Sequence, residues 1–174
     1  MGTKGSKTDQ NEEQAVKLMK EKLTHSDILL ISAVFREKDI DKVREVCEML
    51  NDDHKMFYTH VLDMAIHDGQ LDEIVKYMCS RSLASVEDNY DTYIETAIKR
   101  STVNTKHEIS RESSLELVKF LVNLPGVRKR HVATKSRDTA ILYGMGEIEY
   151  FINGFVENGL NGPSNCLTVH TGDG

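Results

Sequence analysis

Apolar residues recur along this chain in paired segments. In each pair, a first apolar segment with one small residue is followed by a second, amphipathic segment. The small residue is Ala33, Ala65, Ala97 and Gly144, so the first two spacings are 32 residues and the third is 47. This pattern predicts four copies of one helical unit, with an insertion after Arg100. The copies span Ile28–Leu50, His60–Cys79, Thr92–Val122 and Thr139–Gly159.

The second segment of the first three copies carries an apolar stripe at the i, i+3, i+7 spacing of an amphipathic helix. One helix pair cannot bury such a stripe alone, whereas copies stacked side by side form a continuous core. The small residue lets the two helices of a pair approach closely. We therefore expect an all-α fold of stacked helix-turn-helix units. The stripes are Ile40, Val43, Cys47 and Leu50; Leu71, Ile74 and Met78; and Leu115, Val118 and Leu121 or Val122.

Several segments resemble the repeats of ankyrin proteins, which run about 33 residues and open with T-P-L-H-x-A. Thr92–Ala97 (TYIETA) and Thr139–Gly144 (TAILYG) are similar to that opening. Other segments are similar to the opening of the family's second helix and to its glycine-capped exit. These are Gly69-Gln-Leu-Asp, Ser114–Leu121 and Gly146-Glu-Ile-Glu for the opening, and Glu157-Asn-Gly159 for the exit.

The resemblance implies about four degenerate ankyrin-like repeats over residues 24–162, stacked as a solenoid. The chain departs from the family pattern in three ways. No copy has the Thr-Pro pair, the first copy lacks both glycines, and the register slips by one residue between the first two copies. The β-hairpin fingers of the family are therefore left open, and an array of plain helical hairpins of another type is the alternative.

The two ends lie outside the repeats. Residues 11–23 have helical periodicity, and we expect a capping helix that covers the first repeat. We expect residues 1–10 to form a flexible leader and residues 163–174 a disordered tail. Met1–Ser6 (MGTKGS) matches the N-myristoylation pattern with Gly2 as acceptor. Peripheral membrane contact through a lipid on Gly2 is one hypothesis, and a leader without this function is the other.

Composition favours a cytoplasmic protein. The chain has no tryptophan, two prolines and three cysteines, which are an odd number and lie far apart. The cysteines therefore predict neither a disulfide framework nor a metal site. Cys47 and Cys79 lie in apolar patterns and are expected to be buried. No stretch approaches the ~20 apolar residues that cross a bilayer, and the N-terminus lacks the apolar core of a secretory signal.

Charge is distributed unevenly along the chain. The formal net charge is −6, yet residues 21–96 carry −9 and residues 97–137 carry +7. Such polarity favours a charged protein partner and disfavours bulk nucleic-acid binding. The strongest basic run is Arg128-Lys129-Arg130, which is either a docking surface or a solvated loop between the third and fourth copies.

Motifs for catalysis are missing from the sequence. No two histidines have the i, i+4 spacing of a helical zinc site, and no glycine-rich phosphate loop is present. We therefore expect no metal site, no cofactor and no enzymatic activity. A small hydrolase or transferase on a helical scaffold is the alternative, because catalytic groups can meet only in space.

We expect a monomeric protein–protein interaction module that binds, masks or recruits a partner. The resemblance implies that the partner contacts positions just after each small residue and at the tips between units. Aromatic and arginine side chains are the usual anchors of interfaces, which favours Phe35, Tyr90 and Arg100, although Phe35 has equal claim to a core position. The other positions are Arg36, His67, Asp68, Lys99 and Met145, with Asn89 and Asp91 at a tip.

Charge reversal at Arg128, Lys129 and Arg130 should weaken partner binding without lowering thermal stability, because a solvated basic run contributes to encounter rather than to packing. Binding measurements and thermal melts of the triple variant test this expectation. A loss of folding, or unchanged binding, would contradict it.

Overall fold

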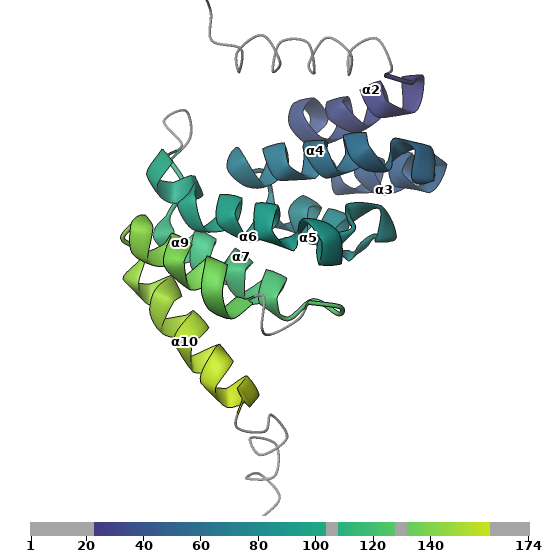
Figure 1. Cartoon of the computed structure of the whole chain (residues 1–174). Helices are drawn as coiled ribbons and strands as arrows, with labels where there is room; N and C mark the ends of the chain where they lie inside the picture. Colours follow the sequence, from purple (N-terminus) through teal and green to yellow (C-terminus); the bar gives the residue numbers. More distant parts are fainter. Residues whose placement is uncertain (1–22, 104–107, 128–131, 161–174) are drawn as a thin grey trace, which may run out of the picture.

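The computed structural model describes residues 23–103, 108–127 and 132–160 of the chain. Within these ranges the regular elements are helical and none is a strand (Figure 1). Among the same residues, no helix is both long and apolar enough to span a bilayer. The predicted all-α class is confirmed. The leader, residues 11–22 of the predicted capping helix, Gly2, Arg128-Lys129-Arg130 and the tail at 163–174 lie outside the described residues.

The helices follow one another as antiparallel pairs, here called units 1 to 4. Unit 1 contains α2 (His25–Ile31), a π-helical segment (Ser32–Glu37) and α3 (Ile40–Met49). Unit 2 contains α4 (Lys55–His67) and α5 (Asp72–Ser80). Unit 3 contains α6 (Val86–Val103) and α7 (Arg111–Val122). Unit 4 contains a second π-helical segment (Val132–Ser136), α9 (Arg137–Leu142) and α10 (Gly146–Leu160).

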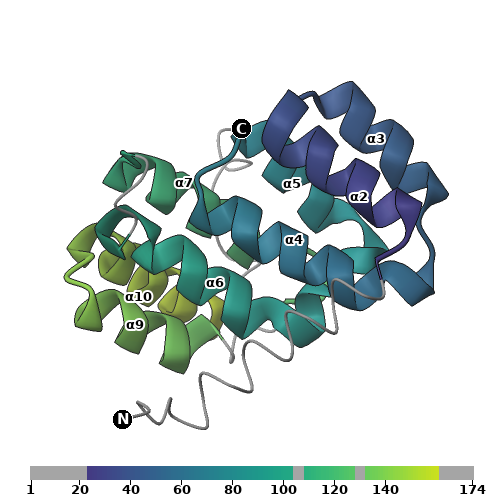
Figure 2. The ribbon, with the colours of Figure 1, turned by 90° about the horizontal axis from the view of Figure 1, so that it is seen from above.

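The units are stacked in two layers. The first helices, α2, α4, α6 and α9, contact one another in chain order, and so do the second helices, α3, α5, α7 and α10 (Figure 2). The buried residues between the layers form one continuous cluster, which contains Cys47 and Cys79 as predicted. Short 3₁₀ turns at Asp52–His54 and Ser82–Ala84 join units 1, 2 and 3. These described connections contain no β-hairpin.

Left-handed residues close the tight turns inside units 1, 2 and 4. Lys38 (φ 52°), Gly69 (φ 65°) and Gly144 (φ 66°) occupy this position. The residue after each one donates a backbone hydrogen bond to the carbonyl of a buried alanine, as in a Schellman-type helix end. The pairs are Asp39 to Ala33 at 3.3 Å, Gln70 to Ala65 at 3.0 Å and Met145 to Ala140 at 2.8 Å.

This turn geometry corrects the alignment of unit 4. Ala140, which is fully buried, takes the place of Ala65, whereas Gly144 takes the place of Gly69. The assignment of Gly144 as the small residue of the first helix was therefore wrong. Met145 follows the left-handed residue and packs inward with 3% exposure, so its predicted exposure was also wrong.

Unit 1 has one extra residue in this turn. The left-handed Lys38 follows Ala33 by five positions, whereas Gly69 follows Ala65 by four. The π-helical segment Ser32–Glu37 contains the additional residue, because a π-turn closes i→i+5 hydrogen bonds instead of i→i+4. Lys38 adopts a conformation that glycine favours, at a cost of about 1 kcal/mol. Unit 1 therefore keeps the fold of its neighbours without the glycine.

Gly69 is constrained by close packing as well as by its positive φ. A β-carbon added there would lie 2.8 Å from the side chain of Ile109. Ile109 belongs to the insertion after Arg100, so this part of the insertion lies over the turn of unit 2.

Arg100 is the largest fully buried side chain described, although it was predicted to face a partner. Its Nε donates to Ser114 Oγ at 3.2 Å and its Nη2 to Ser113 Oγ at 2.7 Å, both on α7. Its Nη1 donates to the carbonyl of Ile66 on α4 at 3.4 Å, and the Asp72 carboxylate lies 3.8 Å from Nη2. Burial lowers the pKa of Arg100, and the charge of Asp72 opposes this shift.

Helical phase explains why the predicted exposure of Arg100 was wrong. Tyr93, Thr96 and Ala97 precede it by seven, four and three residues on α6, and all three are buried. Arg100 therefore continues the inward face of the helix. Tyr90 is also buried, with 3% exposure, because α6 begins at Val86 and places residues 89–91 in a helix rather than at a tip.

Replacing Arg100 with alanine should lower the free energy of unfolding by about 3 kcal/mol, because it leaves a cavity and unpaired serine hydroxyls between two units. Chemical denaturation measures the change. Lys99→Ala is the matched control on the same helix, since Lys99 is half-buried and its side chain forms an ion pair with Glu95 rather than bonds to a neighbouring unit. Equal losses for the two variants would refute a special role for Arg100.

Candidate protein-binding surfaces

Three of the predicted binding residues lie close together where α4 packs on α6. His67 and Asp68 end α4 and are half-buried, with His67 Nδ1 3.0 Å from Asp68 Oδ1. Lys99 lies on α6 and pairs with Glu95. Asp63, which the sequence did not single out, lies between these helices and accepts a hydrogen bond of 2.7 Å from Thr96 Oγ1. We call Asp63, His67, Asp68 and Lys99 the α4–α6 surface.

In the α4–α6 surface, the carboxyl group of Asp63 has a shifted pKa. Burial raises its pKa, although the hydrogen bond from Thr96 and the charges of His60, Lys99 and His67 act in the opposite direction. The α4–α6 surface therefore combines both signs of charge around one partly desolvated carboxyl group. Such a surface suits contacts with a polar partner.

Phe35 and Arg36 lie in the π-helical segment of unit 1. Phe35 is half-buried and packs against the core, and Arg36 is exposed. Of the two, Arg36 is the more exposed to a partner.

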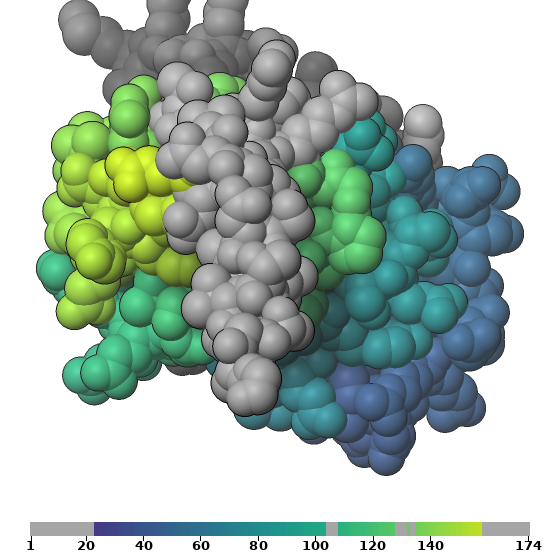
Figure 3. Space-filling model, turned by 90° about the horizontal axis from the view of Figure 1, so that it is seen from below, coloured from purple at the N-terminus to yellow at the C-terminus, as the bar shows by residue number. Residues whose placement is uncertain are grey.

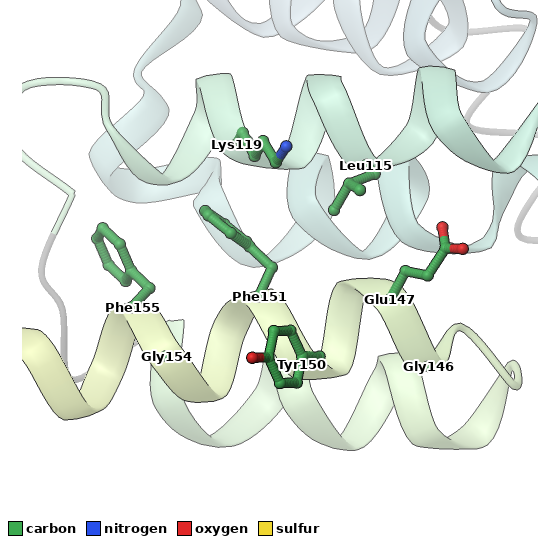
Figure 4. Close-up of a pocket in the computed structure, with 8 residues that line it drawn as sticks. All are labelled: Leu115, Lys119, Gly146, Glu147, Tyr150, Phe151, Gly154 and Phe155. Carbon is green, nitrogen blue, oxygen red and sulfur yellow. The ribbon is translucent and has the colours of Figure 1, made fainter.

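An apolar groove that the sequence did not predict lies between α7 and α10 in the last two units. It has a volume of about 680 Å³ (Figure 4). Phe151 and Phe155 project from α10 toward α7, with ring centroids 6.1 Å apart, and Leu115 faces them from α7. Its lining residues are Leu115, Lys119, Gly146, Glu147, Tyr150, Phe151, Gly154 and Phe155, which we call the α7–α10 groove.

Two glycines leave the α7–α10 groove open. A β-carbon added at Gly146 or at Gly154 would meet no atom within 4 Å. Glycine inside a helix lowers stability by roughly 0.5–1 kcal/mol relative to alanine. Gly154, in the middle of α10, is therefore an unfavourable residue for the helix itself. The feature of the sequence that could have indicated the groove is Gly154, which lies among Tyr150, Phe151 and Phe155 in one amphipathic helix.

The last unit also exposes large apolar side chains. Tyr150 is 83% exposed, and Leu142 and Ile141 of α9 are 77% and 54% exposed. Figure 3 shows this end of the molecule, where α10 (yellow) forms part of the surface. Apolar side chains gathered at a surface mark interaction sites more often than isolated ones do.

A second cavity, of about 530 Å³, lies where the connection from α5 to α6 faces Leu124–Gly126. It contains Cys79, and burial raises the pKa of this thiol to about 12, so it is neutral at physiological pH and a poor nucleophile. Neither this cavity nor the α7–α10 groove is lined by a histidine. Among the described residues, no three His, Cys, Asp or Glu side chains group as metal ligands. The expectation that the protein is not an enzyme stays a prediction.

Comparison of the chain with protein-family models, curated proteins and solved structures finds no match. The resemblance to ankyrin repeats thus has its basis in the sequence segments quoted above. Function has to be inferred from the two surfaces and their chemistry.

Asp63→Asn should raise the free energy of unfolding at pH 7, by under about 1 kcal/mol, and leave it unchanged below pH 4. The raised pKa of Asp63 means that the folded state holds this proton more tightly than the unfolded chain does. The wild-type contribution is therefore lost as the pH rises through the folded pKa, and asparagine imitates the protonated form. Denaturation at several pH values tests this; a pH-independent difference would contradict it.

Proposed function

We propose that this protein is an interaction module that binds a partner protein through the α7–α10 groove. The carrying observation is an open groove with an aromatic lining beside the exposed ring of Tyr150. Aromatic side chains supply much of the energy of protein interfaces, and they do so best in pockets from which water is excluded. Binding there would mask or recruit the partner without any covalent chemistry.

We further propose that the array is a degenerate form of the ankyrin repeat. Support comes from the 32-residue spacing of the first three small residues, from the two-layer order of the helices and from the left-handed turn position in units 1, 2 and 4. The 3₁₀ connections between units 1, 2 and 3 differ from the β-hairpins of the family. The proposal is therefore a repeat that has kept its helix pairs without these fingers.

The α4–α6 surface is a second contact region in this proposal. Its mixed charges favour a polar protein partner over nucleic acid, which a net negative chain repels. A lipid on Gly2 would add peripheral membrane contact, and this hypothesis is independent of both surfaces. Mass spectrometry of the protein from its native source tests it directly.

Gly154→Leu should abolish partner binding, because the new side chain would occupy the α7–α10 groove from a position whose β-carbon meets no atom within 4 Å. Its melting temperature should stay equal or rise, since leucine is favoured over glycine in a helix by about 0.8–1 kcal/mol. Affinity capture from the native organism, with wild type and variant compared by mass spectrometry, measures the loss.

Met56→Gln is the control for this experiment, because Met56 is 70% exposed on α4, outside the residues that line the groove. It should retain every partner that the wild type retains. If Gly154→Leu also retained them all, the α7–α10 groove would not be the binding surface.

A further inference from the structure

A series of cation–π contacts runs along the second-helix layer. Arg44 of α3 lies over the ring of Tyr77 on α5, with 5.6 Å to the centroid. Lys76 of α5 lies over Phe120 of α7 at 5.6 Å, and Lys119 of α7 lies over Phe151 of α10 at 5.9 Å. Each of units 1, 2 and 3 therefore places a cation over an aromatic ring of the following unit. We call these three contacts the cation–π series.

The cation–π series ends at Tyr150. In α5, Lys76 directly precedes Tyr77 in the sequence and lies over the ring of Phe120 in the next unit. In α7, Lys119 directly precedes Phe120 and lies over the ring of Phe151 in the last unit. In α10 the residue before Phe151 is Tyr150, and 83% of it is exposed. The last unit thus presents an aromatic ring where the two units before it carry a cation. An exposed tyrosine face is a binding site for a lysine or arginine side chain.

The charges around Tyr150 also favour a basic ligand. α10 contains Glu147, Glu149 and Glu157 and no basic residue. No ion pair joins these glutamates to the other described residues. The one cation that lines the α7–α10 groove, Lys119, is already paired with Glu116 at 2.9 Å. A basic ligand would therefore gain attraction on approach, whereas anionic lipid or nucleic acid would be repelled.

We infer that the α7–α10 groove binds a basic amphipathic helix of a partner protein. The apolar side chains of this helix would fill the space above Gly154, against Phe151 and Phe155. An arginine or lysine would stack on Tyr150, and neighbouring cations would face Glu147. This inference rests on the proposed function and adds the chemistry of the partner to it.

The shape of the groove favours a helix as the ligand. The lining comes from two neighbouring helices, α7 and α10, and the space between two packed helices accepts the ridge of a third. Helices that bind in such grooves use apolar anchors at i, i+3, i+4 and i+7. Along α10, Glu147, Tyr150, Phe151, Gly154 and Phe155 follow this spacing, so one stripe of α10 faces the ligand along its length.

The test uses the full chain and a fluorescein-labelled peptide of about 16 residues, with leucines at the i, i+3, i+4, i+7 positions and arginine or lysine elsewhere. A matched peptide carries glutamate in place of every basic residue. Fluorescence anisotropy should show saturable binding of the basic peptide and at least tenfold weaker binding of the acidic one. Gly154→Leu should weaken binding of the basic peptide at least tenfold, and Tyr150→Ala or Glu147→Lys about fivefold.

Controls separate these effects from misfolding. Each variant should keep the wild-type helical circular dichroism signal and melt no lower than the wild type, and Met56→Gln should bind the basic peptide like the wild type. Equal affinity for the two peptides, or full affinity in Gly154→Leu, would overturn the inference. A concentration-dependent dimer in sedimentation that Gly154→Leu abolishes would also overturn it, because a second copy would then fill the groove.

The peptide experiment can give a negative result while the proposed function still holds. If the basic peptide binds no better than the acidic one while partner capture still requires an open groove at Gly154, the partner has another chemistry and the inference is wrong. If the basic peptide binds as expected and the variants behave as stated, the groove recognises basic helices.

Discussion

A guanidinium group without solvent contact fixes how the second and third units sit against each other. The donors of Arg100 point in set directions because the group is planar. They meet a carbonyl at the end of α4 and two serine hydroxyls on α7. Apolar packing alone tolerates small shifts between helices, but a buried cation whose hydrogen bonds are broken is costly. The relative placement of α4, α6 and α7 therefore depends on this one side chain.

The last unit is built differently, and its surface follows from that difference. Its second helix has a glycine, Gly154, that lines the α7–α10 groove, and a β-carbon added there would meet no atom within 4 Å. Its aromatic side chains lie partly outside the core, and Tyr150 lies almost wholly outside. The packed interior of units 2 and 3 thus supports a last unit in which Ile141, Leu142 and Tyr150 are exposed.

Much of the fold was predictable because helical periodicity and small residues at regular intervals report directly on packing. The stripe residues Val43, Ile74 and Val118 are buried as expected. Leu71 was also predicted to be buried, but it is 52% exposed because it precedes α5 as its N-cap. The site was harder to predict. The charge of Arg100 suggests a surface position, whereas its phase on α6 places it inside. Tyr90 was predicted at a tip between units, but it lies in the first turns of α6. The α7–α10 groove depends on which faces of two helices meet, and spacing along one helix does not contain that information.

The π-helical turn in unit 1 bears on how the length of a repeat can vary. One additional residue in an α-helix rotates everything after it by about 100°, which would move the apolar stripe off the core. A single widened turn takes up the residue and leaves the downstream phase unchanged. Small insertions are thus tolerated at the end of a first helix, and sequences of such arrays can drift apart in length while their packing stays alike.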